Sequence, residues 1–215
     1  SVTIGNGVTT IGDSAFWDCT RLTSIYITDI TAWCKISGLY NLMDYGSSNK
    51  NLYLNNELVT ELVIPEGVTT IGDSAFWGCA GLTSIEIPNS VTLIGSSAFR
   101  GCTGLTSITI PNSVTTIGSY AFRGCTGLTS VTIGNGVTTI GDSAFWDCTR
   151  LTSITIPNSV TEIAYAAFSG CKGLKDIYYT GTESEWHAIS KGYGWNINTG
   201  NYTIHYNYTP ESDKD

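Results

Sequence analysis

Apolar residues along this chain recur with a constant step of 23 positions. The cysteines that keep this step are Cys79, Cys102, Cys125, Cys148 and Cys171. A phenylalanine stands three positions before each of them, and a leucine stands three positions after. Residues 1–25 are also identical to residues 130–154, so even the polar positions are duplicated. A strict period of this length predicts a solenoid, in which each repeat forms one coil that packs on its neighbours.

One unit, residues 105–127, predicts a coil with three sides. Its L-x-x-I-x-I pattern over 105–110 indicates a short strand that ends at Pro111, because proline has no N–H to extend a ladder. A second brief extended segment is expected at 114–117. A helical turn over 119–123 then directs apolar side chains inward. We expect the first strands to align as a parallel β-sheet on one face of the stack, with short strands and helical turns on the other.

The chain resembles the BspA-like leucine-rich repeat family in the phrase L-x-x-I-x-I-P-x-x-V-x-x-I-G-x-x-A-F-x-x-C. The match covers residues 1–29 and 61–177. This family is common among bacterial surface and secreted proteins. The resemblance implies a right-handed, gently curved leucine-rich-repeat solenoid that is used in adhesion or host-protein binding. It implies no chemistry.

The period also predicts how the chain is divided. We expect one solenoid domain over residues 1–209, followed by a polar tail at 210–215. The expected parts of the domain are truncated N-terminal repeats at 1–29, an irregular island at 30–60, regular repeats at 61–177 and a C-terminal cap at 178–209. Because the chain opens within a repeat and without a polar cap, we expect it to be part of a longer protein. Its uncapped first coil favours end-to-end pairing of chains.

The cap and the island share one variant coil, since residues 25–37 resemble residues 177–190. In the second copy, Thr182 and Glu185 have the spacing of a capping box, and Trp186 shares a helix face with Ile189. We expect this helix to replace the usual second strand. A last strand is expected within 201–209.

Composition and charge exclude two classes of function. Charged residues make up only 13% of the chain, and the net charge is −8 with no run of Lys or Arg. Nucleic-acid binding is therefore not expected, because it requires basic groups opposite consecutive phosphates. A membrane-spanning segment is not expected either, because no stretch of about 18 apolar residues occurs.

The residues that usually carry chemistry are poorly placed for it. The cysteines at the repeat position are expected to form a ladder of buried free thiols, and Cys34 to be buried beside Trp33. No cysteine or histidine pair has zinc-site spacing. The spacing of residues indicates no catalytic partners for His187 or His205. Each glycine recurs at a turn of the repeat, so none is expected to form a phosphate-binding loop. We therefore predict no enzymatic activity and no cofactor.

The position after each phenylalanine varies between repeats, so it is free to specialise. Its occupants are Trp17, Trp77, Arg100, Arg123, Trp146 and Ser169. Because Trp and Arg often anchor interfaces, we hypothesise a recognition ridge on the outer edge. The alternative is that each Trp lies flat over its own Phe and a neighbouring Arg stem.

Two other surfaces are candidates for binding. The outward row of the strand face holds Tyr26, Glu86, Thr109, Thr132, Thr155 and Tyr178. This row suits a flat protein surface or a glycan, although it lacks the aromatic platform that most sugar sites use. In the island, Tyr40, Met43 and Tyr45 lie among Gly, Ser and Asn, a composition typical of binding loops. The alternative is a surface loop whose Leu and Met pack back on the solenoid.

The sequence favours a non-enzymatic protein-binding or adhesion module of a bacterial cell-surface or secreted protein, with a host extracellular protein as partner. The location depends on the family resemblance alone. A carbohydrate-binding module and a structural spacer without its own ligand are the alternatives.

Overall fold

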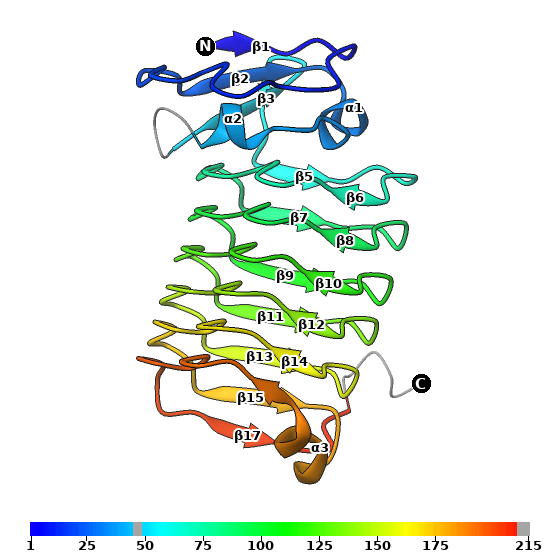
Figure 1. Cartoon of the computed structure of the whole chain (residues 1–215), viewed down its shortest axis with the longest axis vertical. Helices are drawn as coiled ribbons and strands as arrows, with labels where there is room; N and C mark the ends of the chain where they lie inside the picture. The colour runs from blue at the N-terminus through cyan, green and yellow to red at the C-terminus, as the bar shows by residue number, and fades with distance from the viewer. Residues whose placement is uncertain (45–48, 210–215) are drawn as a thin grey trace.

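The computed structural model describes residues 1–44 and 49–209, and over these residues the chain winds into stacked coils (Figure 1). Each regular coil contributes one strand to a large sheet. In the C-terminal part this sheet has the strand order β17-β15-β13-β11-β9, and β5 pairs with β7 in a second, shorter piece. The strands are β5 (Glu61–Val63), β7 (Ser84–Glu86), β9 (Ser107–Ile110), β11 (Ser130–Ile133), β13 (Ser153–Ile156), β15 (Asp176–Tyr179) and β17 (Thr203–His205).

A second parallel sheet runs beside the first, with two residues from each coil and the order β16-β14-β12-β10-β8-β6. Its strands are β6 (Thr70–Ile71), β8 (Leu93–Ile94), β10 (Thr116–Ile117), β12 (Thr139–Ile140), β14 (Glu162–Ile163) and β16 (Ser190–Lys191). Partner residues in both sheets are one repeat apart, as in Ser107 with Ser130 and Thr116 with Thr139. The 23-residue step is therefore the length of one coil, as predicted.

The third side of each coil is a run of hydrogen-bonded turns, and the helical turn expected there is wrong. The Phe99 N–H donates to the Ala121 carbonyl of the next coil (2.8 Å), whereas the Ala98 N–H donates within its own coil, to Gly95 (3.3 Å). Ser97 takes a positive φ of 56°. Alternate amides thus serve the neighbouring coil, an arrangement that an α-helix excludes because all its amides point along its own axis.

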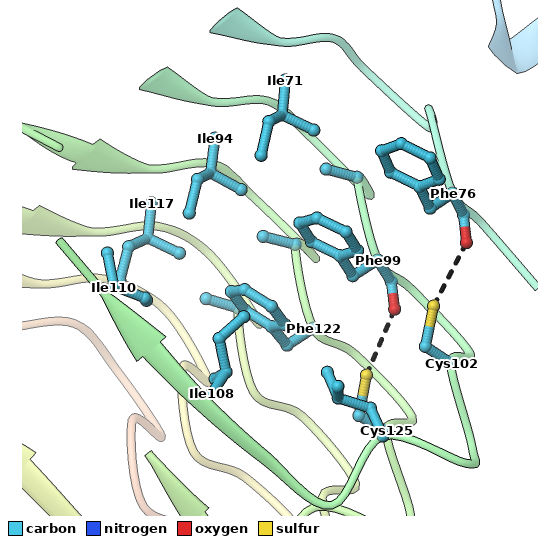
Figure 2. Packing of buried hydrophobic residues seen from close by; sticks show 14 of the residues in the cluster. Ile71, Phe76, Ile94, Phe99, Cys102, Ile108, Ile110, Ile117, Phe122 and Cys125 are labelled. Carbon is cyan, nitrogen blue, oxygen red and sulfur yellow. Dashed lines mark hydrogen bonds between the residues drawn. The ribbon is translucent and has the colours of Figure 1, made fainter. Parts of the chain in front are cut away.

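The interior is a column of identical side chains in register (Figure 2). Neighbouring rings of Phe76, Phe99, Phe122, Phe145 and Phe168 are stacked with centroids 5.2–5.4 Å apart. Beside them, four buried thiols, those of Cys102, Cys125, Cys148 and Cys171, each donate to a phenylalanine carbonyl of the preceding coil, as in Cys102 Sγ to the Phe76 oxygen (3.2 Å). Each of these carbonyls also accepts from the backbone N–H of the cysteine in its own coil, so the thiol adds a second hydrogen bond.

The N-terminal coils form a separate sheet with the order β1-β2-β3-β4. Its elements and the two short helices beside it are β1 (Val2–Thr3), β2 (Ser24–Ile27), α1 (Ile30–Cys34), α2 (Tyr40–Met43), β3 (Asn51–Leu54) and β4 (Glu57–Leu58). Asn55 and Asn56 both have positive φ and reverse the chain, so β4 pairs antiparallel with β3. The segment 30–60 is therefore not wholly irregular, because β3 continues the parallel ladder of β1 and β2.

The two parts of the stack meet across a break in both sheets. Trp33 is buried at this junction, and its indole N–H donates to the Ala75 carbonyl (2.9 Å). The Lys50 N–H donates to the Gly78 carbonyl (2.8 Å). Isolated hydrogen bonds and packing therefore join the parts where a ladder joins the coils elsewhere.

The C-terminal cap begins with the helix α3 (Glu183–Ala188), whose capping box between Thr182 and Glu185 is formed as predicted. The helix does not replace the second strand, however. Residues Ser190 and Lys191 follow it and pair with β14, so α3 is an insertion ahead of β16. The expected last strand is present as β17.

No helix in residues 1–44 and 49–209 combines the length and the apolar character needed to cross a bilayer.

Duplicated sequences in different surroundings allow a test of stacking. Phe16 and Phe145 lie in identical 25-residue segments, but Phe145 is fully buried between two other rings and Phe16 is half-buried. We expect Phe145→Ala to lower the free energy of unfolding by about 3–5 kcal/mol, because it leaves a cavity in the column. Phe16→Ala should cost less than half as much in urea denaturation. Equal losses would contradict the stacking argument.

Candidate functional site

Four aromatic and basic side chains occupy one position in consecutive coils. We call Trp77, Arg100, Arg123 and Trp146 the Trp–Arg row. The Arg100 guanidinium carbon lies 4.6 Å from the centre of the Trp77 ring, and that of Arg123 lies 4.4 Å from the centre of the Trp146 ring. All four side chains are half-buried. Cation–π contact of this kind holds each guanidinium at a fixed place on the surface.

This arrangement corresponds to neither expectation in full. The tryptophans do not project as a free ridge, because an arginine of the adjacent coil covers each ring. The guanidinium itself, and not only the aliphatic stem, lies over the indole. Trp17 stands apart in the N-terminal coil, where it is 66% exposed. It is not one of the four consecutive members of the row.

The Trp–Arg row concentrates positive charge on an acidic protein. Partial burial lowers the pKa of Arg100, and the neighbouring Arg123 lowers it further. Within the described residues, the carboxylates found within 4.0 Å of a basic group pair only with histidines, as His187–Glu183 and His205–Asp176. Neither arginine of the row therefore has a carboxylate at ion-pair distance in that part of the chain.

One acidic group lies in the wider surroundings of the row. Partial burial raises the pKa of Asp44 to about 6, against the opposing effects of Ser74, Arg100 and Lys50. The reciprocal effect of Asp44 raises the pKa of Arg100. The carboxylate of Asp44, in the island, therefore interacts electrostatically with Arg100 of the row.

The island offers less contact area than the sequence suggests. Met43 is buried with Leu42 in the core, so its proposed role as a contact residue is wrong, and the alternative of packing back on the solenoid is correct for it. Tyr40 is 44% exposed, and its hydroxyl donates to Asp13 Oδ1 (3.0 Å). Tyr45 lies outside the described residues, as does the tail 210–215.

The strand face carries aromatic groups at both ends, which the sequence analysis missed. Tyr26 stacks on Tyr53 with ring centroids 4.6 Å apart. At the other end, the Tyr178 ring lies 4.8 Å from His205 and 4.7 Å from Tyr208. Both contacts with the neighbouring strand span 27 residues, the length of the variant coil, so a search at the 23-residue step does not find them.

Between these ends the outward row is polar. Thr109, Thr132 and Thr155 follow one another in register and lead to Tyr178 and then His205. Glu86 is exposed at the start of this row. The structure thus joins a line of hydroxyls to an aromatic cluster, whereas the sequence indicated no aromatic platform on this face.

The described residues contain no group of three or more His, Cys, Asp or Glu side chains placed to hold a metal ion. Burial raises the pKa of the Cys34, Cys79 and Cys125 thiols to about 12, which removes thiolate character at neutral pH. His205 contacts Asp176 at 2.8 Å beside aromatic rings, and within residues 1–44 and 49–209 no Ser, Thr or Cys side chain forms a hydrogen bond with that pair.

The stacked parallel strands and the repeated L-x-x-I-x-I strand define a leucine-rich-repeat solenoid. A profile of the BspA type leucine rich repeat region matches six copies in residues 1–41 and 47–175. The chain belongs to this family.

Solved bacterial proteins share the fold. The chain is 24% identical to a leucine rich repeat protein of T. pallidum, with a TM-score of 0.51, over 88% of this chain and 72% of that protein. It is 34% identical to a leucine-rich repeat protein of Bacteroides ovatus, with a TM-score of 0.51, over 80% of this chain and 35% of that protein. A Eubacterium ventriosum protein of the same kind gives 24% identity and a TM-score of 0.62, over 97% and 59% respectively.

The chain thus spans about a third of the Bacteroides ovatus protein and less than two thirds of the Eubacterium ventriosum protein. A search of curated protein sequences finds no match to this chain.

The thiol ladder has one exception, which gives a chemical test of the fold. Cys19 occupies the repeat position, three residues after a phenylalanine, but it is exposed, so the prediction of a buried thiol is wrong for this cysteine. We expect one of the seven thiols to react with a disulfide reagent in the native protein and all seven to react after denaturation. Cys19→Ser should abolish the native reaction, whereas Cys148→Ser, at the duplicated position, should leave it unchanged. Rapid reaction of two or more native thiols would contradict the buried ladder.

Proposed function

We propose that this chain is a non-enzymatic binding module that contacts a protein partner through the Trp–Arg row. The observation that carries the proposal is the pair of guanidiniums in adjacent coils, each stacked on an indole and neither with a carboxylate within 4.0 Å in the described residues. The net charge of the chain is −8, so this pair is a local exception to the charge of the protein.

Preorganisation supports the choice of this surface. Arg and Trp are enriched among residues that dominate binding energy, and a side chain that is already held loses less rotational freedom on binding. Stacking on Trp77 and Trp146 holds the two guanidiniums in this way. Their N–H groups are suited to paired hydrogen bonds with carboxylates, which favours an acidic segment as the partner's contact.

We infer a location on the bacterial surface or in the secreted fraction, with a host extracellular protein as the partner. The inference is supported by membership of the BspA type repeat family. It is independent of the geometry of the Trp–Arg row.

The experiment is a binding screen of the immobilised chain against purified host extracellular proteins. The double variant Arg100→Gln/Arg123→Gln should weaken binding of a true partner at least tenfold, which corresponds to about 1.4 kcal/mol. Trp77→Ser/Trp146→Ser should act in the same direction, because it frees the guanidiniums.

The matched control is Arg150→Gln, which removes one exposed positive charge outside the row and should leave affinity unchanged. If the row variants bind as tightly as the unmodified chain, or if Arg150→Gln is equally damaging, the row is not the contact surface.

Carbohydrate binding is the second candidate function, favoured by the cluster of Tyr178, His205 and Tyr208 at the end of the threonine line. Aromatic rings beside hydroxyls suit the apolar face and the polar edges of a sugar ring. A glycan array separates this function from protein binding. Signals that disappear in Tyr178→Ala but persist in Arg100→Gln/Arg123→Gln would support it. A structural spacer predicts no reproducible signal in either screen.

A further inference from the structure

The second sheet ends at β6 on an open groove of about 470 Å³. One wall is formed by residues 34–38 and Tyr40, and the other by residues 67–70, 72–73, 93 and 95. Beyond the groove the same line of the solenoid resumes, where Thr10 bridges to Ser37. The groove therefore lies at the junction between the two parts of the stack, and it narrows toward Gly72, where an added Cβ would lie 3.4 Å from the Cys34 carbonyl oxygen.

Two backbone donors belong to residues that line this groove. In the regular coils the Thr115 N–H donates to the Thr92 carbonyl (3.0 Å), and the Gly118 N–H donates to the Ile94 carbonyl (2.9 Å). The equivalent donors in the first regular coil are the amides of Thr69 and Gly72. Neither has a backbone acceptor among residues 1–44 and 49–209.

The acceptor pattern in the regular coils specifies what would complete this edge. The two carbonyls that serve one coil come from residues i and i+2 of the coil before it, here Thr92 and Ile94. Only an extended backbone presents alternate carbonyls to the same side. The groove is thus complementary to a strand.

The walls add side-chain selectivity. Leu93 is 39% exposed at a position where other coils have Thr116, Thr139 or Glu162. Tyr40, 44% exposed, lines the same groove. Lys35 is exposed there and has no carboxylate within 4.0 Å in the part of the chain that the structure describes.

We propose that the groove binds an extended segment of a partner protein, which adds a strand to the edge of β6. Carbonyls of residues i and i+2 of that segment accept from Thr69 and Gly72. An apolar side chain of the segment contacts Leu93 and Tyr40, and an acidic side chain lies opposite Lys35. Main-chain hydrogen bonds and side-chain pockets are the two components of recognition by strand addition. This surface is separate from the Trp–Arg row and does not depend on its role.

A probe for the test is available within the chain itself. A capped peptide of residues 158–165 has carbonyls at Thr161 and Ile163, which in the folded protein accept from the amides of Ser190 (2.9 Å) and Gly192 (2.8 Å). It also carries Glu162 between them. This peptide is to be titrated into the isotope-labelled chain while amide hydrogen exchange is followed by NMR.

At saturation, exchange at Thr69 and Gly72 should slow by about tenfold or more, because both amides gain an acceptor. Exchange at Thr92 and Gly95, which already donate to backbone carbonyls, should not change. Unchanged exchange at Thr69 and Gly72 in millimolar peptide would overturn the proposal, as would protection confined to another edge of the solenoid.

Variants test the side-chain contacts. Leu93→Thr restores the usual residue of the repeat, so it should preserve the fold while weakening the peptide about fivefold through the lost apolar contact. Thr139→Leu places the same apolar group on the second sheet away from the groove and should have no effect. Equal affinity of the unmodified chain and Leu93→Thr would show that the peptide does not contact this wall.

Discussion

The structure depends on the satisfaction of each coil's backbone by its neighbours. A regular coil contains strands of two to four residues, too short to be stable alone, and its third side has alternate amides directed out of the coil. Stacking supplies the acceptors for those amides, encloses the phenylalanine column and brings the thiols from Cys102 to Cys171 to carbonyls of the preceding coil. Register is then fixed at once for both sheets, because a slip by one residue would remove all three kinds of contact.

This dependence explains which features of the structure could be predicted from the sequence. The 23-residue step determines the strand register, the buried phenylalanines and the thiol ladder, because those positions must coincide in every coil. The third side was mistaken for a helical turn because Ser97 and Tyr120 adopt positive φ, which their side chains do not signal. That conformation is imposed by bonding to the next coil, a tertiary effect without a local pattern.

The candidate surfaces were foreseen only in part, for a related reason. Comparing repeats located the Trp–Arg row, but whether Arg100 lies on Trp77 depends on which rotamers neighbouring coils permit. The cluster at Tyr178 was missed because its partners belong to a coil of different length. Residues 69–72 carry no sequence signal for the open edge of β6. That edge follows from the shape of the variant coil that precedes them. The candidate surfaces thus lie where the chain departs from the repeat, and at those positions the periodicity predicts least.

The reversal at Asn55 and Asn56 has a mechanical consequence. From β6 to β16 the second sheet forms one continuous ladder between neighbouring coils, whereas across this junction the indole of Trp33 and the amide of Lys50 supply the hydrogen bonds described above. The two parts of the stack are therefore joined by isolated hydrogen bonds and by side-chain packing instead of a strand ladder. Bending of the solenoid, including any that accompanies ligand binding, should therefore concentrate at this junction.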